Sequence, residues 1–154
     1  AENPAILSEA CRVIMNALVK QDKLVIETHG LADFVLKVMR KHPDSERLQE
    51  YGCGALWNLL FRGSSKERFV TKLDGLTTIT VAMKKFPNNV SLQWVGCGVI
   101  AVLSKMPELK DCLIDAGCLE VVGTAFRAHK NTQNDKTAKL KNRAHRIMSR
   151  LTAE

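Results

Sequence analysis

Apolar residues recur along this chain at the steps expected of amphipathic helices. Phe34, Val35, Val38 and Met39 follow one another at intervals of three and four residues, and residues 48–60 show a looser form of the same spacing. Positions separated by three and four residues share one face of an α-helix. The pattern therefore predicts helices, each with one side turned towards a core.

The pattern also repeats within the chain. Residues 48–59 read LQEYGCGALWNL and residues 92–103 read LQWVGCGVIAVL, an offset of 44 residues. The pattern continues at an offset of 42 before the first copy and of 48 after the second, where a polar loop at 131–135 accounts for the surplus. The equivalent positions are Ile6, Leu48, Leu92 and Leu140; Cys11, Cys53 and Cys97; Ile14 and Leu56; Asn16 and Asn58; Val99 and Ile147; and Leu103 and Leu151. A repeat of this length is typical of helical repeat proteins.

Each repeat divides into three helical segments. Short segments at 66–73 and 108–115 have a degenerate counterpart at 22–28. A middle helix then follows Gly30, Asp74 and Gly117, and a turn leads to a long helix. The candidate N-caps of the long helices are Asp44 or Ser45, and Asn88 or Asn89. We therefore predict an all-α chain.

Two residue types predict close packing inside the long helices. Gly52, Gly54, Gly96 and Gly98 lie within predicted helices, where each costs roughly 0.5–1 kcal/mol relative to alanine. Close approach of a neighbouring helix is the compensating gain that we expect. The equivalent cysteines are expected to be small buried packing residues.

The three-helix unit resembles the armadillo repeat. The matching residues are the block GCGALWNLL at 52–60, its weaker copy at 96–104, and the glycines at 30 and 117. Asp74 departs from the pattern, as does Ala-Cys-Arg at 10–12. HEAT repeats are the nearest alternative, but they have two helices per unit.

The resemblance implies a right-handed α-solenoid in which long third helices line a concave groove. The chain would form one domain, 1–154, with a partial repeat at 6–42, repeats at about 43–86 and 87–130, and a C-terminal capping helix at about 135–151. It would be a minimal solenoid or a fragment of a longer one.

In armadillo grooves, asparagines of the third helix hold the backbone of a bound peptide. Asn58 and Asn16 match these asparagines, whereas Val102 interrupts the series. The tryptophan that importin-α-like proteins place four residues earlier is replaced by Arg12, Gly54 and Gly98, which disfavours binding of a basic nuclear-localisation signal.

Helical steps add further groove candidates, most of them basic. We therefore expect an extended acidic protein segment, bound through amide groups and arginine–carboxylate pairs as in β-catenin-like grooves. The complete set of predicted groove residues is Arg12, Asn16, Lys20, Arg47, Glu50, Tyr51, Asn58, Arg62, Trp94, Asn142, Arg146 and Arg150.

Several alternatives stay open. Asn16 and Asn58 could cap local backbone, and Trp57 could pack against a neighbouring repeat rather than touch a ligand. The basic run at 136–150 could be a solvated terminal face. It holds six of the 23 basic residues and no acidic one, which leaves 17 basic and 16 acidic residues elsewhere.

No motif for catalysis, cofactor or metal binding is visible in the sequence. Cys112, Cys118 and His129 lack the usual zinc spacing, and the paired glycines lie in helices rather than in a phosphate loop. No apolar run approaches the roughly 20 residues of a membrane span, and no signal peptide is evident. The odd number of cysteines, five, favours reduced thiols and a cytoplasmic location, with the nucleus as the alternative.

These observations favour a non-enzymatic scaffold for protein–protein interaction, without a cofactor. An RNA-binding basic solenoid is the alternative, although base-reading repeats place similar triplets in every unit and these repeats do not. A third reading is a structural segment of a larger protein. In that case an apolar N-terminal face around Ile6 and Ile14 would be an internal interface and a site of self-association.

Overall fold

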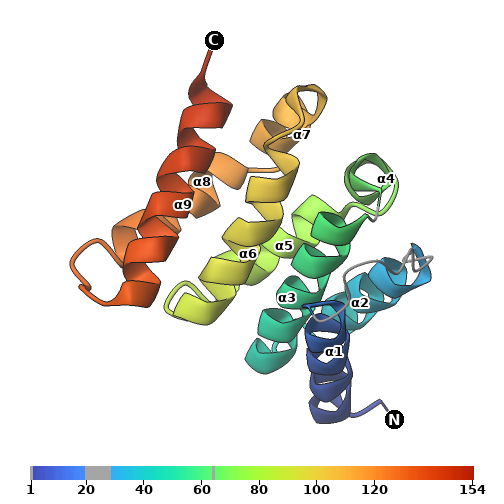
Figure 1. Ribbon diagram of the computed structural model, residues 1–154. Helices are drawn as coiled ribbons and strands as arrows, with labels where there is room; N and C mark the ends of the chain where they lie inside the picture. The colour runs from blue at the N-terminus through green and yellow to red at the C-terminus, as the bar shows by residue number, and fades with distance from the viewer. Residues whose placement is uncertain (1, 20–28, 64) are drawn as a thin grey trace.

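The structure, a computed structural model, describes residues 2–19, 29–63 and 65–154. Every regular element in these ranges is a helix, so the prediction of an all-α chain is confirmed (Figure 1). The helices are α1 (Pro4–Val19), α2 (His29–Lys41), α3 (Glu46–Arg62), α4 (Lys66–Thr71), α5 (Gly75–Lys85), α6 (Val90–Leu103), the short 3-10 helix η1 (Pro107–Leu109), α7 (Lys110–Asp115), α8 (Cys118–Ala128) and α9 (Asp135–Thr152).

The long helices form a row. Helix α1 packs against α3, α3 against α6, and α6 against α9, so α1 and α9 are the two ends of the row (Figure 1). The middle helices α2, α5 and α8 form a second row that packs behind the first. The arrangement is that of stacked helical repeats.

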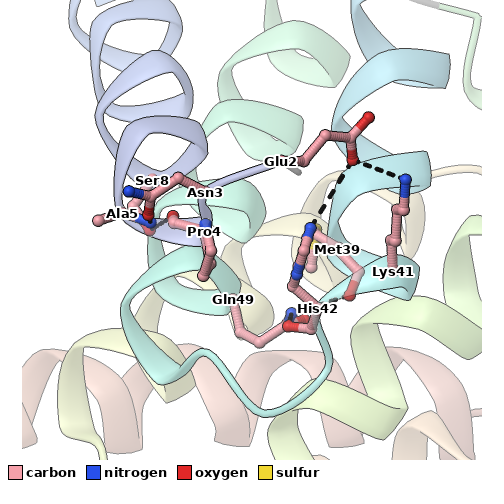
Figure 2. A network of polar contacts seen from close by, with 9 residues as sticks. All are labelled: Glu2, Asn3, Pro4, Ala5, Ser8, Met39, Lys41, His42 and Gln49. Carbon is pink, nitrogen blue, oxygen red and sulfur yellow. Dashed lines mark hydrogen bonds and ion pairs between the residues drawn. The ribbon is translucent and has the colours of Figure 1, made fainter.

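A glutamine joins the two rows in each of two repeats. The Nε2 of Gln49 donates to the carbonyl oxygens of Met39 and His42, both at 3.0 Å, as Figure 2 shows. The Nε2 of Gln93 makes the same pair of bonds to Met83 and Phe86, also at 3.0 Å. Both glutamines are buried, and each satisfies carbonyl groups that the end of a middle helix leaves without an intrahelical donor.

The helix-interior glycines lie where helices approach closely, as predicted. A Cβ atom at Gly52 would be 2.6 Å from the sulfur of Met39, and one at Gly96 would be 2.6 Å from the sulfur of Met83. The same contact is thus repeated 44 residues further along the chain. The equivalent cysteines are also buried as predicted, because Cys11, Cys53 and Cys97 are each 0% exposed.

The predicted turns before the long helices are present, and the structure shows which candidate residue occupies the N-cap of each helix. Asn89 caps α6, since its side chain accepts a hydrogen bond from the backbone N–H of Leu92 at 2.8 Å. Ser45 occupies the equivalent position before α3 without a side-chain cap.

Asp74 and Gly117, aligned by the repeat, both adopt the left-handed conformation, with φ of 50° and 79°. Aspartate therefore tolerates the backbone that glycine favours.

The short segments are helical where the structure describes them. Helix α4 corresponds to the predicted segment 66–73, and η1 with α7 to the segment 108–115. The degenerate segment at 22–28 lies outside the described residues. Within the described ranges, no single helix has the length and apolar character to cross a membrane; only α6 taken with 107–115, a pair bent by 115°, passes that test jointly.

Candidate ligand-binding groove

The predicted groove residues lie on the row of long helices. Arg12 and Asn16 are on α1; Arg47, Glu50, Tyr51, Asn58 and Arg62 are on α3; Trp94 is on α6; and Asn142, Arg146 and Arg150 are on α9. Lys20 is outside the described residues. Two clusters include members of this set, one around the carboxylate of Glu9 on α1 and one around the guanidinium of Arg143 on α9.

The first group surrounds Glu9 of α1. Its carboxylate pairs with Arg12 at 2.7 Å and with Arg47 of α3 at 2.6 Å. The guanidinium of Arg47 also lies 5.5 Å from the ring centre of Tyr51. The hydrogen bond from Arg12 is the main reason that the pKa of Glu9 is lowered. At this end of the row, the basic residues are therefore paired within the protein.

Two predicted ligand contacts join helices within the protein. The Nδ2 of Asn58 donates to the backbone oxygen of Met15 at 2.8 Å, and a guanidinium nitrogen of Arg62 donates to that of Val19 at 3.2 Å. The open alternative for Asn58 was a cap on local backbone, but the bond that the structure shows is to a carbonyl group of α1, 43 residues away in the sequence. Asn16, its equivalent on α1, is exposed.

The second group is a stack centred on Arg143 of α9. Its guanidinium carbon lies 3.3 Å from the ring centre of Trp94 and 4.4 Å from that of Trp57. The two indoles meet edge to face at 6.0 Å and 89°. One guanidinium nitrogen also donates to the backbone oxygen of Trp94 at 2.9 Å. The stack therefore ties α9 to both α3 and α6.

Burial in this stack changes the chemistry of Arg143. Removal of water from the guanidinium lowers its pKa to about 10. The group still carries its charge at neutral pH. A cation held between aromatic faces is attracted by their quadrupoles, by about 0.5–2 kcal/mol depending on desolvation.

A hollow of about 180 Å³ opens beside the stack, between α3, α6 and α9. Among the described residues that line it, four are basic and none is acidic. Phe61, 62% exposed, and Trp57 add apolar surface. The lining residues are Trp57, Phe61, Gly98, Ala101, Val102, Lys105, Arg143, Arg146 and Arg150.

Small residues of α6 line one side of the hollow. Gly98 takes the place that Arg12 and Arg146 occupy in other repeats, and a Cβ there would be 2.6 Å from the indole of Trp57. Val102 takes the place of Asn58 and Arg150. The departures from the repeat pattern in α6 therefore place Gly98 and Val102 in the lining of the hollow that the basic residues of α9 border.

Arg150 continues the basic surface beyond this hollow. It contacts the hydroxyl of Ser104 at 3.3 Å, and it borders a second hollow of about 470 Å³ that Lys105 and Lys110 also line. Glu154 is the acidic residue at that second hollow. The two hollows share Lys105 and Arg150 in their linings, so they are neighbours near the C-terminal end of α6.

Sequence reasoning included Arg146, Arg150 and Trp94 among the groove residues but left out Arg143, which stacks on Trp94 and lines the hollow together with the other two arginines. Arg143 is equivalent to Tyr51 in the repeat register, and Tyr51 was already a groove candidate. Extending that register to α9 would have found it. Phe61 and Lys105 lie at helix ends and carried no comparable signal. Trp57 does pack against the neighbouring repeat at Gly98, although it is half-buried rather than enclosed.

Metal ligation and thiol chemistry have no assembled site in the described part of the chain. No group of three or more histidine, cysteine or acidic side chains is placed there to hold a metal ion. The five cysteines are free, and burial raises the pKa of Cys11, Cys53, Cys97 and Cys118. A raised pKa keeps a thiol protonated and weakens it as a nucleophile.

Comparison with known proteins identifies one similar protein by sequence. The chain is 28% identical over 116 residues to Protein aardvark of Dictyostelium discoideum. The match covers 67% of this chain and 15% of the length of that relative. No protein-family model matches the sequence, and no solved structure matches it.

Proposed function

We propose that this chain is an armadillo-type α-solenoid that acts as a non-enzymatic scaffold and binds an extended acidic segment of another protein. The observation that carries the proposal is the hollow beside Trp57, where four basic residues meet apolar surface without an acidic neighbour in its lining. Such a lining suits a segment in which carboxylates alternate with aromatic or aliphatic side chains.

The two ends of the row differ in charge, so an acidic segment binds more strongly near α9 than near α1. Arg146 and Arg150 border the hollow and are exposed, so they are available for bidentate bonds to carboxylates. Near α1, Glu9 pairs with Arg12 and Arg47 and would repel an acidic ligand. Binding is therefore centred on α6 and α9, with Trp57 and Phe61 as apolar contacts.

Selection from a displayed library of random 14-residue peptides tests this proposal. We expect enrichment of acidic peptides that contain at least one large apolar residue. Each should quench or shift the fluorescence of the two tryptophans, since both lie at the stack. The Arg146→Glu/Arg150→Glu variant should bind these peptides at least tenfold more weakly, because charge-assisted hydrogen bonds contribute about 1.5–3 kcal/mol each.

The matched control is Lys37→Glu/Lys72→Glu, which changes the net charge equally at exposed positions on α2 and after α4. It should bind the selected peptides like the unmodified chain. Equal loss in both variants would show that net charge alone attracts the peptides. Selected peptides that bind the Arg146→Glu/Arg150→Glu variant undiminished would refute the site.

A further inference from the structure

The first long helix has an apolar stripe that the rest of the described protein leaves uncovered. Ile6 and Val13 of α1 are 67% and 58% exposed, and Ala10 and Ala17 lie on the same stripe at helical steps of three and four. The opposite side of α1, with Cys11 and Leu18, is buried against α3. Helix α1 is thus apolar on two sides, and among the described long helices it packs against α3 alone, at the end of the row (Figure 1).

The repeat shows what such a stripe contacts elsewhere. The four equivalent positions are buried in each of the other long helices. They are Leu48, Gly52, Ala55 and Leu59 in α3; Leu92, Gly96, Val99 and Leu103 in α6; and Leu140, Ala144, Ile147 and Leu151 in α9. Each of these helices packs against the middle helix that precedes it in the chain, namely α2, α5 and α8.

The contact at the centre of the stripe is specific. The side chain of Met39 in α2 lies against Gly52, and that of Met83 in α5 lies against Gly96. Ala10 is the equivalent of these glycines on α1. Its Cβ atom requires such a side chain to shift from the position that Met39 and Met83 take. The equivalent position in α9 is also an alanine, Ala144, which is buried where α9 packs against α8.

We propose that the stripe Ile6, Ala10, Val13 and Ala17 is an internal packing surface for a helix of the α2 and α5 type. This helix belongs to an additional repeat of the same polypeptide, stacked on the α1 side. It carries a methionine or a similarly long apolar side chain opposite Ala10, and a turn like that between α2 and α3 joins it to Pro4. The proposal uses the repeat register but not the ligand groove.

The geometry before α1 is compatible with that turn. Ser45, which precedes α3, has φ of −84° and ψ of 93°, an extended conformation that a residue before proline also requires. Asn3 is its equivalent before Pro4, and proline is favoured at the first position of a helix. A helix that ends in the α2 turn can therefore lead directly into α1.

An extended chain tests this inference. In this chain, a second copy of residues 29–45 replaces residues 1–3 and precedes Pro4. A Val13→Cys substitution then reports, through its labelling rate, whether the stripe on α1 is covered. In the 154-residue chain, a maleimide should label the Val13→Cys variant rapidly. In the extended chain, labelling should slow at least tenfold and the Tm should rise by about 5 °C or more.

The control extension carries glutamine at the copies of Val35, Val38 and Met39, so that it keeps the length but loses the apolar face. The labelling rate and the Tm of this control chain should equal those of the 154-residue chain. Unchanged labelling with the apolar extension would overturn the inference.

A second copy of the chain as the occupant would also overturn it. In that case the 154-residue chain would sediment as a dimer that Ile6→Glu/Val13→Lys converts to a monomer. Val81→Lys, at another exposed apolar position, would leave that dimer intact. We expect the 154-residue chain, its Ile6→Glu/Val13→Lys variant and its Val81→Lys variant all to sediment as monomers.

Discussion

At the scale of single residues, burial is the main determinant of the reactivity of the cysteine thiols. Cys53 and Cys97 sit between packed helices, and desolvation raises the pKa of each thiol from 9.0 to about 12. Their thiols serve as small apolar groups that fill the space between rows. At each of these two thiols, the folded protein consequently holds a proton that the unfolded chain releases near pH 9.

This difference predicts a loss of stability at alkaline pH. The stabilising contribution of both thiols is complete below about pH 9 and declines as the pH rises towards 12, because only the unfolded chain is then deprotonated. By pH 10, one unit above the unfolded pKa, we expect each thiol to lower the free energy of unfolding by about 1.4 kcal/mol. Urea titrations under reducing conditions at pH 7.5 and 10 measure the decline.

The Cys53→Ala/Cys97→Ala variant separates this effect from other titrating groups. It should start less stable at pH 7.5 but lose less free energy between the two pH values than the unmodified chain. An identical decline in both proteins would contradict the assignment to these thiols.

At the scale of helices, side-chain size at one position sets the distance between neighbours. Gly98 allows the indole of Trp57 to lie on the backbone of α6, and Arg143 then covers the same indole from α9. The contact between Met15 and Gly54 is the equivalent pair one repeat earlier. Packing of consecutive long helices therefore depends on a large residue meeting a glycine.

We predict that Gly98→Ala destabilises the protein. Alanine gains about 1 kcal/mol of helix propensity, but its Cβ would be 2.6 Å from the Trp57 ring, and overpacking costs typically about 1–3 kcal/mol. The Tm should fall by a few degrees, and the tryptophan emission should shift as Arg143 is displaced.

Gly30→Ala is the matched control, since nothing lies within 4 Å of a Cβ at that position of α2. It should keep or raise the Tm and leave the tryptophan emission unchanged. A Gly98→Ala protein as stable as the Gly30→Ala protein would show that the two helices separate without cost.

At the scale of the whole molecule, stability is distributed along the row. Helices α3 and α6 are flanked on both sides by long helices, whereas α1 contacts α3 alone in that row. In stacked repeats, each unit gains stability from its direct neighbours. Opening should therefore begin at α1, where Asn58 supplies one of the polar contacts that hold it.

Hydrogen exchange followed by mass spectrometry tests this order. We expect the slowest exchange in α3 and α6 and faster exchange in α1. Loss of one hydrogen bond costs about 0.5–1.5 kcal/mol, so Asn58→Ala should speed exchange in α1 by roughly 2–12-fold and leave α9 unchanged. Asn142→Ala, at an exposed position on α9, should change neither helix, and acceleration of α1 in that control would contradict the prediction.

The sequence by itself was sufficient to predict the helices and their register. Helical periodicity and capping depend on residues three or four apart, and the recurrence of Gly-Cys-Gly identified equivalent positions before any contact was seen. From these the burial of Cys53 and the close approach at Gly52 followed correctly. The armadillo resemblance, extended by helical steps, also assigned Asn58, Arg12 and Arg47 to one groove face.

Only the tertiary structure decided how those groove residues are used. Asn58 donates to the backbone of α1, Glu9 pairs with two arginines, and Arg143 joins two tryptophans from different helices. Apart from the pair of Glu9 with Arg12, which lies within α1, each of these contacts joins residues 38 or more positions apart in the sequence. The distance and angle between helices determine such contacts, and both result from the packing of the entire row rather than from any local stretch of sequence.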